Sequence, residues 1–166
     1  MKNYICKIAT IEEMNRKWDY EISLAINKKN WIIWKKQNIN NYKSGKIIPY
    51  YGILDDQIIC EATAVLTSDI VQNSNKLVDD TTAYLTAFRT NKGYENRGYF
   101  SKLYKFMEED LKNKGYDLLT LGVEPDEIRN KEIYSHYGFV KHIKNAKEVY
   151  PDGTEIYVEY YGKKLK

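Results

Sequence analysis

Residues 83–123 read AYLTAFRTNKGYENRGYFSKLYKFMEEDLKNKGYDLLTLGV, and this stretch decides the fold. Its first part is rich in aromatic and threonine side chains, which favours a strand at Ala83–Thr90. Apolar residues then recur at helical spacing and predict a helix from about Tyr99 to Lys114: Phe100, Leu103, Met107 and Leu111. Leu118–Val123 is almost continuously apolar, as in a strand that is covered on both faces. A strand, a helix and a strand in this order predict a right-handed crossover between neighbouring strands.

The sequence on both sides continues this pattern of strands and helices. Thr10 and Glu13 have the spacing of a capping box, which predicts where the first helix begins. Further strands are expected at Tyr4–Ile8, Ile47–Leu54, Ile58–Leu66, Phe139–Ile143 and Glu155–Tyr161, and further helices from Ile11 to about Ala25, from Trp31 to about Gln37 and from Pro125 to about Tyr137. No linker or repeat interrupts this order, so residues 1–166 are expected to form one α/β domain.

Length and charge exclude several classes of protein. A chain of 166 residues fits one domain, since domains have roughly 100–200 residues. Lys and Arg number 26 against 23 Asp and Glu, and a net charge of +3 is too small to favour nucleic acid or an acidic membrane. No apolar stretch approaches the ~20 residues of a membrane-spanning helix, and no signal peptide is visible. We therefore expect a cytoplasmic protein.

Cysteine and histidine are too few to predict a metal centre. Cys6 and Cys60 lack the spacing of metal ligands and are expected to be reduced and buried. His136 and His142 are the only histidines, so no metal cofactor is expected. Tyrosine is the unusual component, with 16 residues, and it suits half-buried strands, aromatic-lined pockets and proton donation.

The loop between the strand and the helix, Asn91–Gly98, has the features of an anion-binding site. Its glycines allow a ligand to approach the backbone closely, and the first turn of the following helix offers N–H groups and a positive dipole. Lys92, Arg97 and Lys102 add full positive charges. A pyrophosphate fits these features, but the loop is neither a P-loop nor a GxGxxG fingerprint, and a plain strand-to-helix connection stays open.

Two motifs resemble those of the GNAT superfamily of acetyl-CoA-dependent N-acetyltransferases. The phosphate loop of that family reads Gln/Arg-x-x-Gly-x-Gly/Ala, and the aligned residues here are Glu95-Asn96-Arg97-Gly98-Tyr99-Phe100. Only Gly98 matches, because Glu95 replaces a basic or amide residue and Phe100 replaces a small one. The second signature is a helix that ends in Tyr-x-x-x-Gly-Phe, and it matches Tyr134-Ser135-His136-Tyr137-Gly138-Phe139.

The resemblance implies a GNAT-like fold, with a mixed central sheet of about six to seven strands flanked by about four helices. It also implies acetyl-CoA as co-substrate, without a metal, and transfer of the acetyl group to an amine. The residues that it places at the cofactor are Phe88, Arg89, Thr90, Arg97, Gly98, Tyr99, Phe100, Ser101 and Asn130. The backbone of Phe88 and Thr90 would bind the pantetheine arm and polarise the thioester carbonyl, as an oxyanion hole does.

The same resemblance assigns Tyr134 as the general acid that protonates the leaving thiolate, although a tyrosine on the core face of a helix needs no such role. Glu124, just past an apolar strand, and Glu61, among apolar strand residues, are candidate bases because partial burial raises the pKa of a carboxyl group. Water and backbone could serve instead. Cys60 has no activating neighbour in the sequence, so we expect direct attack in a ternary complex rather than an acyl-enzyme.

The acceptor is not readable from the sequence, and a small amine, an amino acid and a protein amine all stay open. Trp31 and Trp34 could line its pocket or form a core stripe, and the same holds for Tyr50 and Tyr51. Other functions also stay open: a non-catalytic acyl-CoA-binding module, a toxin-like acetyltransferase acting on aminoacyl-tRNA, and a plain phosphate-binding scaffold. A homodimer is compatible with each of them.

Overall fold

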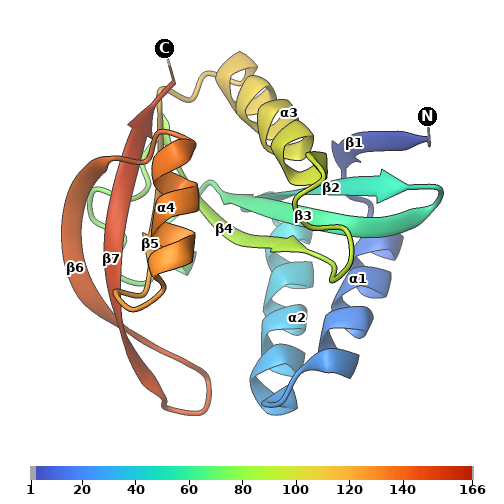
Figure 1. Cartoon of the computed structure of the whole chain (residues 1–166). Coiled ribbons are helices and arrows are strands. Elements are labelled where there is room, and N and C mark those ends of the chain that lie inside the picture. The colour runs from blue at the N-terminus through green and yellow to red at the C-terminus, as the bar shows by residue number, and fades with distance from the viewer. Residues whose placement is uncertain (1–2, 166) are drawn as a thin grey trace. The chain divides into compact units, whose positions relative to one another are not determined.

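The computed structural model describes residues 3–165 (Figure 1), in which strands and helices follow the predicted order. The strands are β1 Tyr4–Ile8, β2 Ile47–Leu54, β3 Gln57–Val65, β4 Thr82–Thr90, β5 Leu118–Val123, β6 Lys141–Val149 and β7 Glu155–Lys164. The helices are α1 Ile11–Leu24, α2 Lys28–Lys43, α3 Tyr99–Asn113 and α4 Ile128–His136, and a short 3-10 helix covers Ser68–Ile70. The strands form one mixed sheet in the order β1-β2-β3-β4-β5-β7-β6, with β4 and β5 parallel. The predicted α/β fold class is confirmed.

Two compact units make up the chain, and β4 runs through both. Unit 1 contains the residues up to Ala64 together with Ala87–Asp110, and unit 2 contains Val65–Thr86 and the residues from Leu111 onwards. Ala87 has a left-handed backbone with φ of 59°, which is uncommon for a residue with a side chain. β4 pairs with β5 over Thr82–Leu85, so the left-handed residue Ala87 comes two positions after the paired part of the strand.

The core of unit 1 is built on β2 and β3, whose residues are almost all buried. Tyr50 and Tyr51 are 0% and 1% exposed, so both belong to the core. The predicted capping box begins α1: the N–H of Glu13 donates to Thr10 Oγ1 at 3.2 Å, and the N–H of Thr10 donates to Glu13 Oε1 at 2.9 Å. This start turns the apolar stripe of α1, which includes Trp18, towards the core.

Unit 2 contains the antiparallel strands β5, β7 and β6, with α4 lying against β5 and β7 (Figure 1). The loop before β4 covers part of this sheet, because Leu77 packs against Val158 and Tyr160. The hydroxyl of Thr120 on β5 donates to the carbonyl of Leu77 at 2.7 Å and fixes this loop in place. The loop therefore covers one face of the sheet of unit 2, and Val158 and Tyr160 of β7 lie on that face.

Several predicted boundaries are wrong, and tertiary contacts explain those of α2 and β6. α2 begins at Lys28 rather than Trp31 and continues to Lys43, because the hydroxyl of Tyr42 donates to the carbonyl of Ala9 and anchors its last turn. β6 continues past Ile143 because β7 pairs with it as far as Val149. α4 begins only at Ile128, three residues later than its predicted start at Pro125, because the segment before it forms a turn.

Candidate active site

The loop between β4 and α3 is a series of turns in unit 1, with left-handed backbones at Gly93, Asn96 and Gly98. Gly98 has φ of 82° and comes directly before α3, and a Cβ at this position would meet no described heavy atom within 4 Å. The backbone conformation of Gly98 therefore favours glycine, and the space beside it is open. An open turn at a helix N-terminus is an arrangement that binds anions.

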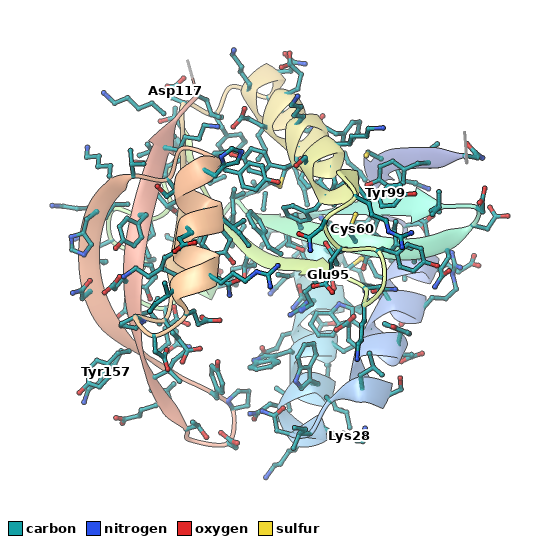
Figure 2. All side chains as sticks on the ribbon, in the orientation of Figure 1. Lys28, Cys60, Glu95, Tyr99, Asp117 and Tyr157 are labelled. Atoms are coloured by element: carbon teal, nitrogen blue, oxygen red, sulfur yellow. The ribbon has the colours of Figure 1, made fainter. Side chains whose placement is uncertain are left out.

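The first turn of α3 is held by a tyrosine from β1. The hydroxyl of Tyr4 donates to the carbonyl of Tyr99 at 2.7 Å, and the two rings lie 4.8 Å apart. Glu95 in the loop and Tyr99 at the start of α3 can both be followed in Figure 2. The side chains of Arg97 and Lys102 are exposed at the same place, so both cations are available to a phosphate group.

The end of β4 faces two different sets of side chains in unit 1. Phe88 lies against two rings of α3, with centroid distances of 5.2 Å to Phe100 and 6.3 Å to Tyr104. Arg89 lies on the other face of the strand, where its guanidinium is 4.7 Å from the centroid of Trp31. The predicted cofactor residues therefore lie on two faces of β4. Phe88 packs against Phe100 on the α3 face, whereas the side chain of Arg89 lies on the opposite face, near α1 and α2.

Glu61, a predicted base, belongs to a buried ionic cluster in unit 1. Its carboxylate accepts a hydrogen bond from Arg89 at 3.0 Å and lies 3.9 Å from the ammonium of Lys17. Lys17 also donates to Glu21 at 2.8 Å and to the side-chain oxygen of Asn91 at 2.7 Å. Burial raises the pKa of Glu61, while Arg89 and Lys17 oppose that rise. The raised pKa of Glu61 agrees with the expectation for a base, but its carboxylate already pairs with two cations, Arg89 and Lys17.

Sequence reasoning misses Lys17, although the sequence contains a signal for it. Lys17 lies between Met14 and Trp18 on the buried face of α1, and its side chain is 2% exposed. A lysine at a core position of an amphipathic helix implies a buried anion or carbonyl as partner. Glu61 and Asn91 meet that need, and Asn91 is also the first residue of the loop before α3.

The signature Tyr-x-x-x-Gly-Phe forms the C-terminal cap of α4 in unit 2. The N–H of Phe139 donates to the carbonyl of Tyr134 at 3.0 Å, and the N–H of Gly138 donates to the carbonyl of Ser135 at 2.9 Å. Gly138 has the left-handed φ, 102°, that this cap, a Schellman motif, requires. The helix cap alone therefore explains why Gly138 and Phe139 follow Tyr134 at this spacing, whether or not Tyr134 has a chemical role.

Tyr134 lines a cavity of about 640 Å³ within unit 2. The walls come from α4 and from neighbouring strands, and they include Val123, Phe139 and Tyr161. His136, on the same helix, is exposed and lines the cavity as well. Sites for small molecules have volumes of roughly 300–1,000 Å³, so the predicted acid borders a space of suitable size.

Glu124, the other predicted base, follows β5 in unit 2 and is half-buried. Burial raises its pKa, and the carboxylates of Glu127, Asp126 and Glu148 raise it further. Glu148 is a carboxylate that sequence reasoning misses, because the predicted strand ends before it. Burial raises the pKa of Glu148, and a hydrogen bond from Tyr160 lowers it.

The remaining candidates have structural partners. Cys60 is buried in unit 1, and burial raises the pKa of its thiol to about 11, so it stays protonated at neutral pH. Asn130, on α4, donates from its amide to Glu127 at 2.9 Å. Trp31 and Trp34 are half-buried, with ring centroids 5.5 Å apart. Residues 3–165 contain neither a group of three metal-ligating side chains nor a helix long and apolar enough to cross a membrane.

The acetyltransferase (GNAT) family has a sequence model that matches residues 15–139. No curated protein sequence matches the chain. Among solved structures, an N-acetyltransferase from Staphylococcus aureus has a TM-score of 0.67 at 16% identity, over 99% of both chains. The ribosomal-protein-S18-alanine N-acetyltransferase from Escherichia coli has a TM-score of 0.67 at 13% identity, over 99% of this chain and 95% of that one. A Salmonella typhimurium protein with its cofactor acetyl-CoA has a TM-score of 0.66 at 10% identity, over 99% and 95%.

At these identities the solved structures show a common fold. The family match covers most of the chain and includes both the loop before α3 and the capped helix α4. The chain belongs to the acetyltransferase (GNAT) family of N-acetyltransferase enzymes.

Proposed function

We propose that the protein transfers the acetyl group of acetyl-CoA to an amine, by direct attack within a ternary complex. The observation that carries this proposal is the left-handed Gly98 beside open space at the start of α3, inside the family match. The pyrophosphate of CoA suits such a place, because N–H groups and the helix dipole favour a doubly charged anion there.

The cofactor would be held mainly by backbone groups, which is why the unusual Glu95 and Phe100 do not exclude it. The N–H groups of Gly98 and of the first turn of α3 would bind the pyrophosphate, with Arg97 and Lys102 beside it. The residues of the first turn are Tyr99, Phe100 and Ser101. The backbone of Phe88–Thr90 would bind the pantetheine arm, and the amide of Asn130 would bind a further part of the cofactor.

The chemistry requires an acid for the leaving thiolate and a base for the attacking nitrogen. Tyr134 would be the acid, since a phenol, with an ordinary pKa of about 10, carries its proton at neutral pH. Glu124, Glu61 and water are the candidate bases. Glu61 is the least free of these, because Arg89 and Lys17 already neutralise its carboxylate.

The test is an acceptor screen. The purified protein would be incubated with acetyl-CoA and with primary amines that include amino acids, polyamines, amino sugars, lysine peptides and peptides with free N-termini. We expect at least one amine to release free thiol and to yield the matching acetamide by mass spectrometry. If acetyl-CoA binds tightly while no amine of any class releases thiol, the non-catalytic acyl-CoA-binding module replaces this proposal.

A further inference from the structure

Asn91, which directly follows β4 in unit 1, is the buried end of the loop before α3. It is 6% exposed, whereas the residues from Lys92 to Gly98 are exposed or half-buried. The N–H of Asn91 donates to the carbonyl of Ile59 on β3 at 2.7 Å, and its own carbonyl accepts from the N–H of Tyr94 at 3.1 Å. The path of the loop therefore depends on how Asn91 is held.

The side chain of Asn91 has one orientation, because the two atoms of its amide have different partners. Its nitrogen donates to the carbonyl of Ile58 at 3.1 Å, and its oxygen accepts from the ammonium of Lys17 at 2.7 Å. An ammonium only donates and a carbonyl only accepts, so a reversed amide would lose both bonds. Lys17 and Asn91 are both buried, and a buried polar group without its partner is costly. The bond between them therefore fixes the residue from which the loop starts.

Lys17 is itself held by two carboxylates of unit 1. It donates to Glu21, one turn further along α1, at 2.8 Å, and its ammonium lies 3.9 Å from the carboxylate of Glu61 on β3. These carboxylates compensate the charge of the ammonium, and Asn91 is uncharged. What the bond to Asn91 adds is therefore a defined position, from a charged donor whose hydrogen bonds are stronger than those of a neutral one.

The other end of the loop has a separate support. The hydroxyl of Tyr4 on β1 donates to the carbonyl of Tyr99 at 2.7 Å and holds the first turn of α3. Between the two ends, the hydroxyl of Tyr94 donates to the side-chain oxygen of Gln57 at 3.1 Å, in an exposed contact. Loss of the bond from Lys17 should therefore displace the loop at its β4 end and leave α3 folded.

We propose that Lys17 is a positioning residue for the cofactor. Acting through Asn91, it holds the loop so that the N–H groups at the start of α3 meet the pyrophosphate of CoA. This inference rests on the proposed acetyl transfer, in which no other step uses the buried lysine. The side chain of Lys17 is 2% exposed, so it has little surface with which to touch the cofactor itself. A loop that is ordered before the ligand arrives binds it more tightly, because binding then has less to order.

The affinity for CoA in a cycle of variants tests whether Lys17 acts through Asn91. Asn91→Ala keeps the ions of the cluster and releases the loop, and calorimetric titration should show CoA binding weakened by about tenfold or more. Lys17→Met should weaken it by a similar factor, and Lys17→Gln, which keeps a polar side chain, replaces that variant if it does not fold.

The double variant gives the decisive comparison. It should bind CoA no more than about twofold more weakly than either single variant, because both substitutions remove the same bond. Losses that multiply in the double variant would show that the charge of Lys17 acts on the cofactor directly, and they would overturn the inference. Affinity of Asn91→Ala equal to that of the parent protein would overturn it as well.

Met14→Ala is the matched control for loss of stability. Met14 lies one turn before Lys17 on α1 and is 1% exposed, so its truncation removes core packing but none of the hydrogen bonds that hold the loop. This variant should unfold at a lower urea concentration and still bind CoA as the parent protein does. A loss of affinity as large as that of Asn91→Ala would assign the effect to general destabilisation.

A shortened acetyl donor shows which part of the cofactor is affected. S-acetylpantetheine has the thioester and the pantetheine arm of acetyl-CoA but no pyrophosphate. With the best amine of the screen, Asn91→Ala should raise KM for acetyl-CoA by about tenfold or more at an unchanged kcat, and its kinetics with S-acetylpantetheine should match the parent protein. Equal losses with both donors would contradict a role at the pyrophosphate.

Binding of CoA also separates this inference from acetyl transfer. If the single variants lose affinity for CoA as expected and no amine is ever acetylated, the positioning role stands and the proposed transfer fails. If amines are acetylated and the single variants bind CoA as tightly as the parent protein, the transfer stands and the positioning role of Lys17 fails.

Discussion

At the scale of single residues, Tyr134 can be tested without disturbing the cap that it helps to form. The Schellman bonds of α4 use only backbone groups of Tyr134 and its neighbours, so Tyr134→Phe keeps both the cap and the ring. We expect the free energy of unfolding to change by no more than about 0.5 kcal/mol. We expect kcat and kcat/KM to fall together by roughly 10²-fold or more, because the lost proton acts mainly in the transition state.

Steady-state kinetics and urea unfolding of the same preparations check both expectations. Tyr157→Phe is the matched control, since it removes a phenol that is 65% exposed on β7 and lines no wall of the Tyr134 cavity. It should match the parent protein in both measurements. A parent-like rate for Tyr134→Phe would mean that solvent protonates the thiolate.

Gly98 offers a second prediction at this scale. A valine there must adopt the left-handed backbone, which costs about 1–2 kcal/mol, and its side chain would enter the open space beside the start of α3. Gly153→Val carries a similar strain, with φ of 90° and no described atom within 4 Å of the added Cβ, but it lies in the turn before β7. Both variants should lose similar stability.

Only Gly98→Val should lose affinity for acetyl-CoA, by tenfold or more in calorimetric titration, because only there does the side chain block a phosphate. Equal affinities of the two folded variants would show that the loop before α3 is a connection without a binding role.

At the scale of elements, the ionic cluster joins α1 to β3 and to the end of β4 within unit 1. Lys17→Met leaves Glu61 and Asn91 without the buried ammonium that they share. Removing one partner of a buried ion pair costs about 3–5 kcal/mol, and we expect a loss of that size in the free energy of unfolding.

Lys35→Met is the control for that substitution. Lys35 pairs with Asp19 at 2.6 Å near the surface, where the Asp19 side chain is 66% exposed, so the expected loss is about 0–1 kcal/mol. Chemical denaturation of both variants gives the comparison directly. Similar losses in the two proteins would show that the cluster contributes no more than a surface pair.

Elements with strong local signals are predicted well from the sequence. A few neighbouring residues are enough to predict three of these elements: the capping box at Thr10, the Asp55-Asp56 turn and the apolar run of β5. Asp55 and Asp56 both have positive φ, as a two-residue hairpin turn requires. α2 and β6 are predicted too short, because their ends depend on partners that lie far away in the sequence, Ala9 and β7.

The candidate site divides in the same way. Tyr134 lies in a motif that the sequence contains whole and Gly98 is the matching residue of a second one, and the structure gives each a local reason, a helix cap for Tyr134 and a left-handed turn for Gly98. Lys17 and Glu148 have meaning only through contacts with other elements, Asn91 in one case and Tyr160 in the other. A single sequence does not show such pairs, because the packing of a helix against a loop decides the first and the register between two strands decides the second.

At the scale of the whole molecule, binding of acetyl-CoA should appear as stability against heat. A ligand that binds only the native state adds about 2.7 kcal/mol at 100 times its Kd. For a chain of this size, 1 kcal/mol corresponds to roughly 2–4 °C in Tm, so saturating acetyl-CoA should raise Tm by about 5–10 °C. Differential scanning fluorimetry at increasing acetyl-CoA measures this rise, and its absence at millimolar ligand would contradict cofactor binding.

Comparing CoA with 3′-dephospho-CoA tests whether the 3′-phosphate also contributes to this rise in Tm. Arg97 and Lys102 are exposed cations beside the start of α3, and 3′-dephospho-CoA should raise Tm less than CoA if either of them meets that phosphate. Arg97→Gln and Lys102→Gln should then shrink the difference between the two ligands, whereas Lys114→Gln, at the far end of α3, should leave it unchanged. Equal shifts for both ligands in the parent protein would place the 3′-phosphate in solvent and confine the role of this loop to the pyrophosphate. The pair of ligands therefore separates charge contributed by side chains from the backbone N–H groups, which no substitution of Arg97 or Lys102 removes.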